Sequence, residues 1–238
     1  MITWQPLIDA CWPAERVVAV GPWTLRITPG AGGRVNAISG DAPEAIDEAE
    51  AAARAHDQRP SFVVFPGQER LDAALAARGY HVADRVRLWT GEARALAGEP
   101  LPFATAFPLW PPLAIMGDIW REGGHVGPAR QAVMARAARP QGILARIDDR
   151  AAGCAFVAAH GDTAMLSAVE VLPRFRRREA AGLILRAAAH WAVGEGCRRL
   201  ALVAAHDNHP ANAAYARHGM REEAGYHYRR APDMETAQ

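Results

Sequence analysis

Apolar residues along the N-terminal half alternate with polar ones or form short runs, and elsewhere recur at every third or fourth position. Alternation and short apolar runs between turn residues predict strands, whereas the longer spacing predicts helices. The expected strands are 23–28, 34–39, 61–65 and 80–90, and the expected helices are 43–55 and 69–77. The half is therefore predicted to be mixed α/β. Glycines at 30, 32 and 33 are interpreted as a hairpin turn, because no helical pattern follows them as a phosphate loop would require.

The C-terminal half shows the same mixture in a different order. A helix is expected at 128–138, followed by an antiparallel meander of three strands at 142–147, 153–159 and 163–171. Residues 179–194 place Leu183, Ala187 and Trp191 on one side, which is typical of an amphipathic helix. A short strand at 200–204, a helix at 210–218 ended by Gly219 and a closing strand at 221–230 complete the pattern.

Five prolines between residues 98 and 112 are unfavourable for a helix or a central strand and favour a connection. We therefore expect two domains, 1–97 and 98–238. A chain of 238 residues that is 50% hydrophobic can bury a sizeable core.

Charge and composition exclude several classes of protein. A net charge of +1 gives no electrostatic footprint for nucleic acid. No signal peptide is expected, because Trp4, Pro6 and Asp9 interrupt the first residues, and no apolar stretch is long enough to span a membrane, so we expect a cytoplasmic protein. The three cysteines are far apart in apolar surroundings, which predicts free buried thiols.

The segment 171–185 carries the clearest chemistry in the sequence. An expected strand leads into a turn with arginines at 174, 176, 177 and 178, and then into a helix that begins with small residues. Free backbone N–H groups at a helix start, the helix dipole and nearby guanidinium groups together form a seat for a diphosphate. The alternative for this turn, taken alone, is a solvated charged corner.

Two motifs in this half resemble those of the GNAT superfamily of acyl-CoA-dependent N-acetyltransferases. The family's V-x-P strand end and R/Q-x-x-G-x-G/A loop are matched by Val171, Pro173, Arg176 and Ala181. Its second signature, L-x-V-x-x-x-N-x-x-A-x-x-x-Y-x-x-x-G-F, is similar to the segment 200–220, with small differences in spacing. The N-terminal half resembles the degenerate first half of tandem GNAT proteins and lacks the R-x-x-G-x-G/A loop. The resemblance implies two tandem α/β units with a central, largely antiparallel sheet flanked by helices.

The resemblance also implies an activity, in which acetyl-CoA donates its acetyl group directly to the amine of a small molecule, an amino acid or a peptide terminus. A backbone N–H near Val169 to Val171 would stabilise the developing oxyanion. Tyr215 matches the general acid that protonates the departing thiolate, and Asn208 matches a residue that bonds the pantetheine arm or a nearby loop. The diphosphate of the cosubstrate is expected at Arg176, Arg177, Arg178, Ala180, Ala181 and Gly182.

The general base is left open between Glu170, His160 and an ordered water chain. For Glu170 the alternative role is an ion pair with an arginine of the basic turn. His206 and His209 flank Asp207 and Asn208, but no third ligand stands at a suitable spacing, so no metal site is expected.

Glu179 departs from the family pattern because it replaces the first glycine of the diphosphate loop. A carboxylate there repels a diphosphate, while Arg176, Arg177 and Arg178 offset its charge. We expect Glu179 inside the first helical turn, where no positive φ is required, so CoA binding should be weakened and not lost. The alternative function is a catalytically decayed CoA-binding or sensor module.

Overall fold

The computed structural model describes residues 2–232, and the chain divides into two units, each with its own core. Unit 1 comprises Met1–Pro13, Leu88–Ala204 and Asn208–Glu223, and unit 2 comprises Ala14–Arg87, Ala205–Asp207 and Ala224–Gln238. The units differ from the expected halves 1–97 and 98–238. The reason is that β5 (His81–Glu92) and β11 (Arg221–Arg230) each contain residues of both units.

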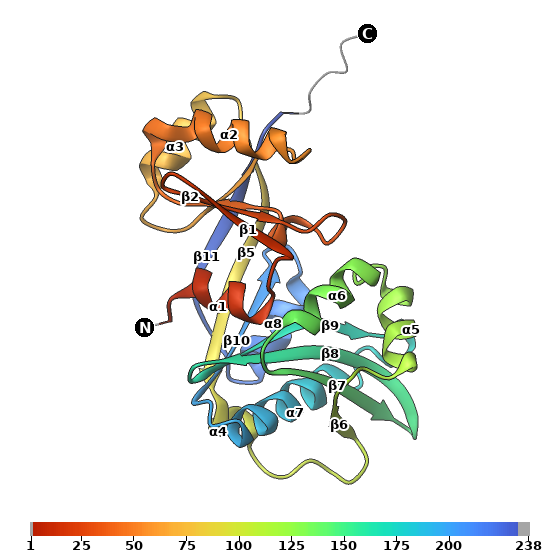
Figure 1. Cartoon of the computed structure of the whole chain (residues 1–238). Coiled ribbons are helices and arrows are strands. Elements are labelled where there is room, and N and C mark those ends of the chain that lie inside the picture. Colours follow the sequence, from red (N-terminus) through yellow and green to blue (C-terminus); the bar gives the residue numbers. More distant parts are fainter. Residues whose placement is uncertain (1, 233–238) are drawn as a thin grey trace. The chain divides into compact units, whose positions relative to one another are not determined.

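Unit 2 is a sheet with the helices α2 (Ile46–Ala55) and α3 (Glu69–Ala77) on one face (Figure 1). Its strand order is β1-β2-β3-β4-β11-β5, in which β3 and β4 are parallel and the β1–β2, β2–β3 and β4–β11 pairs are antiparallel. Trp23, Phe62 and Tyr80 pack edge to face in its core, with ring centroids 5.2 and 5.6 Å apart. The elements are β1 (Arg16–Val20), β2 (Trp23–Ile27), the 3-10 helix η1 (Gly33–Val35), β3 (Ile38–Ser39), η2 (Pro43–Ala45), α2 (Ile46–Ala55), β4 (Ser61–Val64) and α3 (Glu69–Ala77).

The strand predicted at 34–39 is wrong over most of its length. Residues Gly33–Val35 form a 3-10 turn, and only Ile38 and Ser39 pair with β2. Asn36 accounts for the difference, because its side chain bonds the backbone of Thr28 and Gly32 and so replaces ladder hydrogen bonds. The glycines still connect two antiparallel strands, as a hairpin does.

Unit 1 contains the predicted meander, with α7 on one face of its sheet and α5 and α6 on the other (Figure 1). The strand order is β5-β10-β9-β8-β7-β6, with β9 and β10 parallel and β6 to β9 antiparallel. The elements are α1 (Trp4–Cys11), α4 (Ala93–Ala97), β6 (Ala106–Leu109), α5 (Ala114–Gly123), α6 (Pro128–Arg136), β7 (Pro140–Ile147), β8 (Arg150–His160), β9 (Thr163–Val171), η3 (Pro173–Phe175), α7 (Ala180–Gly194), β10 (Arg199–Ala205) and α8 (His209–Arg217).

The proline-rich segment is not only a connection, because it contains β6. That strand lies at the end of the strand order, where Pro108 can be accommodated because an edge strand needs only one of its two rows of hydrogen bonds. Cys11, Cys154 and Cys197 are free and buried, as the sequence predicts. Among the described residues, no helix is long and apolar enough to cross a membrane.

Candidate functional site

Two parallel strands of unit 1 separate along their length. β9 and β10 pair only from Thr163 opposite Arg199 to Leu166 opposite Leu202, although both strands continue further. Just beyond this point β9 has a bulge against β8, where Ala168 has a φ of +52° and its carbonyl accepts a hydrogen bond from Trp120 Nε1 at 2.8 Å. Val169 and Val171, the predicted oxyanion region, therefore lie on the part of β9 that has left β10.

The basic turn after β9 presents a row of backbone donors. Arg177 and Glu179 have φ values of +60° and +63°, and α7 begins at Ala180. The N–H groups from Arg177 to Gly182 donate to no acceptor among the residues that the structure describes, and Leu183 is the first to bond back, to Glu179 O at 3.0 Å. Successive N–H groups in a turn with alternating φ sign form a concavity that suits an anion. The segment thus has the donor geometry that a diphosphate needs.

The three arginines of the turn have different surroundings. Arg176 donates through Nε to Val171 O at 3.2 Å, and its Nη2 lies 3.8 Å from Glu170 Oε1. Arg178 pairs with Asp148 at 2.6 Å. Arg177 has no side-chain partner within the described part of the chain. Of the three, its guanidinium is the one available to an incoming anion.

Glu179 does not lie in the first helical turn, so that expectation is wrong. It is the residue before α7 and adopts left-handed backbone, which costs a residue with a Cβ about 1–2 kcal/mol relative to a right-handed conformation. Its carboxylate pairs with Arg217 at 3.3 Å and lies 3.5 Å from His218 Nε2. The His218 ring also explains Gly182, because a Cβ at that position would lie 2.6 Å from the ring.

Tyr215 lies in the core of unit 1 on α8, 9% exposed, with its ring centroid 6.3 Å from that of Trp89. Burial raises the pKa of Tyr215 to about 12, and its hydroxyl bonds no partner among the described residues. The phenol is therefore protonated at neutral pH and has a proton to donate. Asn208 caps α8, where its side chain accepts a hydrogen bond from Ala211 N at 3.2 Å.

Glu170 is in contact with both the basic turn and the end of α5. Its side chain is 11% exposed, and burial, opposed by the charges of His125 and Arg176, raises its pKa. The carboxylate lies over Gly123, where a Cβ would be only 2.2 Å away. The ion pair with an arginine of the turn is thus present, and the raised pKa also suits a base.

The other base candidate of the sequence, His160, lies at the far end of β8. His160 pairs with Thr163 of β9, whereas Glu170 pairs with Cys154 of β8. Along β8, His160 and Cys154 lie about 20 Å apart at a rise of 3.3–3.4 Å per residue. His206 donates its backbone N–H to Arg85 O, and its ring lies 3.2 Å from Arg87 Nη2. No group of three metal-binding side chains occurs among the described residues.

Sequence reasoning missed three residues of the site. Trp120 fixes the bulge, Gly123 makes room for Glu170, and Asn212 accepts a hydrogen bond from Trp89 Nε1 at 2.9 Å beside Tyr215. Met116, Ile119 and Trp120 are buried at helical spacing in 114–123, which was the signal available for α5. The contact partners themselves come from separate elements, and spacing alone does not indicate them.

A strand that leaves its parallel neighbour and enters a helix through a turn of free N–H groups belongs here to a mixed α/β fold. A family model described as the acetyltransferase (GNAT) family matches residues 98–220, which is more than half of the chain. The chain belongs to the GNAT acetyltransferase family. A search of curated proteins finds no match.

Solved structures agree with this fold. A GCN5-related N-acetyltransferase from Kribbella flavida superposes with a TM-score of 0.73 at 18% identity, covering 100% of this chain and 98% of its own. A conserved protein of unknown function from Staphylococcus epidermidis gives 0.69 at 14% identity, covering 98% of both chains. A tandem GNAT protein from the clavulanic acid biosynthesis pathway gives 0.60 at 18%, covering 91% of this chain and 80% of its own. The predicted GNAT-like α/β fold is confirmed.

Proposed function

We propose that the protein is an N-acetyltransferase that moves the acetyl group of acetyl-CoA to the amine of a small molecule, an amino acid or a peptide terminus. The observation that carries the proposal is the row of unbonded N–H groups from Arg177 to Gly182, placed directly after a strand that has separated from its neighbour. Bound acetyl-CoA supplies an acyl group activated as a thioester. Arg177 and the start of α7 would hold its diphosphate.

The residues around the separated strands would divide the remaining work. A backbone N–H of the bulged segment near Val169 to Val171 would donate to the oxyanion as it forms. Tyr215 would give its phenolic proton to the thiolate, and Glu170 would accept the proton of the amine. Asn208 caps the helix that carries Tyr215, so its proposed role is to position that helix, and contact with the pantetheine arm is not needed for it.

The test combines binding and turnover on the full chain. CoA and acetyl-CoA should each raise the melting temperature, and one or more amines from a panel of amino acids, polyamines and peptides should release free CoA thiol from acetyl-CoA. Ligand that binds the native state alone stabilises it by an amount set by its concentration and affinity. Absence of any shift at millimolar CoA would remove the basis of the proposal.

A CoA-binding sensor is the second candidate, and Glu179 is the observation that favours it. The residue holds a carboxylate and a strained backbone at the mouth of the N–H row. Stabilisation by CoA without thiol release, for every amine tested and for acetyl-, propionyl- and succinyl-CoA alike, would decide for the sensor.

A further inference from the structure

Ala168 has a strained backbone at the point where β9 leaves β10. Its φ of +52° costs a residue with a Cβ about 1–2 kcal/mol relative to right-handed backbone. The register between β8 and β9 shifts here, so that Ala168 and Val169 together stand opposite the single residue Ala155. A bulge whose first residue has positive φ usually has glycine there. Strain of this kind persists only where the surrounding structure imposes it, and it is concentrated at functional sites.

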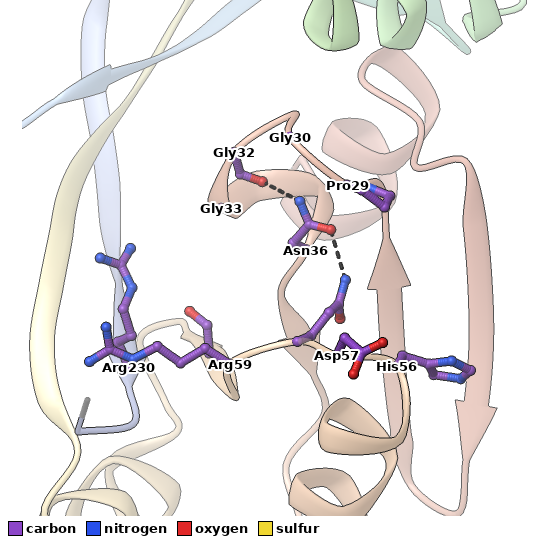
Figure 2. A pocket seen from close by; sticks show the side chains of 11 residues that line it. Pro29, Gly30, Gly32, Gly33, Asn36, His56, Asp57, Arg59 and Arg230 are labelled. Carbon is purple, nitrogen blue, oxygen red and sulfur yellow. Dashed lines mark hydrogen bonds between the residues drawn. The ribbon is translucent and has the colours of Figure 1, made fainter. Parts of the chain in front are cut away.

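The contact that holds Ala168 is the indole of Trp120. That side chain is 1% exposed, and its Nε1 donates to Ala168 O at 2.8 Å. A similar contact occurs in unit 2, where Asn36 Nδ2 donates to Gly32 O at 2.9 Å in the loop beside a cavity of about 570 Å³ (Figure 2). There the residue with positive φ is a glycine, which adopts this backbone at no steric cost. At Ala168 the hydrogen bond, which contributes about 0.5–1.5 kcal/mol, has to offset a real strain.

Contacts on either side of Trp120 fix its place on α5. Met116, one turn earlier, packs on β7, where a Cβ at Gly142 would lie 2.9 Å from Met116 Cε. Gly123, one turn later, lies under the carboxylate of Glu170. Met116, Trp120 and Gly123 are separated by four and three positions and therefore share one face of the helix. The same face of α5 thus contacts the bulge and the proposed base.

Holding the carbonyl of Ala168 also fixes the N–H of Val169, because both groups belong to one planar peptide unit. This peptide unit is trans, so its C=O and N–H point in opposite directions. The carbonyl points at the indole on α5, and the N–H of Val169 consequently points away from α5. The opposite face of this sheet is covered by α7, whose start is the proposed diphosphate site (Figure 1).

We propose that Trp120 is a positioning residue for acetyl transfer, whose indole N–H holds the Ala168–Val169 peptide unit so that the Val169 N–H points at the oxyanion as it forms. This role rests on the proposed function and deepens it, because it names one donor within the segment and the side chain that aims it. A preorganised donor stabilises developing charge because it need not reorient during the reaction. Without the indole N–H, the strained peptide unit is free to relax and the donor loses its direction.

The test replaces Trp120 with phenylalanine, which keeps an aromatic ring and removes the N–H. Trp120→Phe should reduce kcat about tenfold or more, because loss of a whole oxyanion donor costs roughly 10²–10³-fold and here the donor is misdirected. KM for acetyl-CoA and the Kd of CoA should stay unchanged, because the proposed diphosphate site lies on the basic turn. A benzothiophene analogue of tryptophan at position 120, with sulfur in place of the N–H, should give the same loss with the shape of the ring kept.

Trp23→Phe is the matched control. Trp23 is also 1% exposed and also donates through Nε1 to a backbone carbonyl, that of Ala45 at 2.8 Å, but it lies in β2 of unit 2. Both variants lose the same kind of bond, so similar decreases in melting temperature are expected, whereas kcat should fall in Trp120→Phe alone. Crystal structures without ligand give a second readout. The Ala168–Val169 peptide unit should be rotated in Trp120→Phe and unchanged in Trp23→Phe.

The role of Trp120 is overturned if Trp120→Phe keeps its kcat, if kcat falls equally in Trp23→Phe, or if kcat and CoA affinity fall together. A peptide unit that keeps its orientation in crystals of Trp120→Phe would overturn it as well. These results differ from failure of the proposed function. If the unaltered protein releases no thiol from acetyl-CoA with any amine, acetyl transfer itself fails, and the role of Trp120 fails with it.

Discussion

The two units contain the same local sequence of elements with different chemistry at the first turn. Unit 1 has β9, α7, the parallel strand β10 and α8; unit 2 has β3, α2, the parallel strand β4 and α3. In unit 1 the turn into the helix carries arginines and unbonded N–H groups. In unit 2 the Trp23 indole donates to Ala45 O at 2.8 Å, and acidic residues occupy the start of α2.

Two more features distinguish the turn before α2 in unit 2 from the basic turn of unit 1. Gly40 lies so near Trp23 that a Cβ would be 2.6 Å from the ring, and Glu44, Asp47 and Glu48 are acidic residues at the start of α2, of which Asp47 pairs with Arg78. A helix start favours an anion only while its N–H groups are free and the surrounding charge is not negative. The repeated strand–helix–strand fold is thus not sufficient, and the proposed diphosphate site rests on the turn of unit 1.

The largest effect on turnover is expected from replacing the buried Tyr215 of unit 1, with a buried tyrosine of unit 2 for comparison. Tyr215→Phe should reduce kcat about 10²-fold or more, because a positioned general acid contributes roughly 10²–10⁴, while CoA affinity stays unchanged. Tyr80 of unit 2 donates to Glu50 at 2.9 Å and is the matched control. Tyr80→Phe should lower the melting temperature and leave kcat unchanged. Equal loss of kcat and CoA affinity in Tyr215→Phe would make its role one of packing.

Glu170→Gln should reduce kcat/KM about 10²-fold, the lower range for a general base. Because burial raises the pKa of Glu170, the acidic limb of the pH profile should lie above that of an ordinary carboxyl group. Activity depends on the ionised form, so it should fall as the pH decreases through that pKa. The limb should be absent in Glu170→Gln. A limb that persists unchanged in the variant would assign the base to water or to another group.

Arg177→Ala should weaken CoA binding about tenfold, since a charge-assisted hydrogen bond contributes about 1.5–3 kcal/mol and this one is exposed to solvent. The change should appear in KM for acetyl-CoA and in calorimetry with CoA, with kcat little altered. Arg54→Ala removes an exposed arginine from α2 of unit 2, where it pairs with Glu50, and should leave CoA affinity as it was. Similar losses in both variants would mean a general effect of charge.

Two substitutions of Glu179 distinguish the effect of its strained backbone from the effect of its charge. Glu179→Gly removes both and should raise the free energy of unfolding by about 1 kcal/mol and CoA affinity several-fold. Glu179→Ala removes the charge and keeps a Cβ in left-handed backbone, so it should improve CoA affinity without the full gain in stability. Urea unfolding and calorimetry measure the two effects. Weaker CoA binding by both variants would show that the carboxylate assists the site.

The basic turn and the helix that follows it could be predicted from the sequence because all of their parts are close together in the chain, while the binding of a diphosphate there stays a prediction. Arg176, Arg177 and the small residues after them are neighbours in sequence, so their order alone places them at a helix start. The contact of Glu170 with Gly123 joins a strand to a distant helix, and no periodicity encodes it. The left-handed backbone of Glu179 was not predicted either, because the helix was expected to begin at Glu179, one residue before its observed start at Ala180. The side-chain bonds of Asn36 to Thr28 and Gly32, which stand where a strand was expected, were not predicted either, because they depend on the folded loop.

The smallest effect on activity is expected in unit 2. Arg229, and less strongly His227, hold the pKa of Asp72 at about 2, below the ordinary value of 3.8. A lowered folded-state pKa stabilises the protein above the unfolded-state pKa, and this stabilisation is lost as the pH falls from about 4 towards 2. Asp72→Asn should therefore lower the melting temperature by a constant amount between about pH 5 and 7, and the difference should shrink below about pH 4. Turnover should not change, because the ion pair lies on α3 and β11 of unit 2, and the residues proposed for acetyl transfer lie in unit 1. A loss of kcat without a loss of stability would show that the two units are coupled in catalysis.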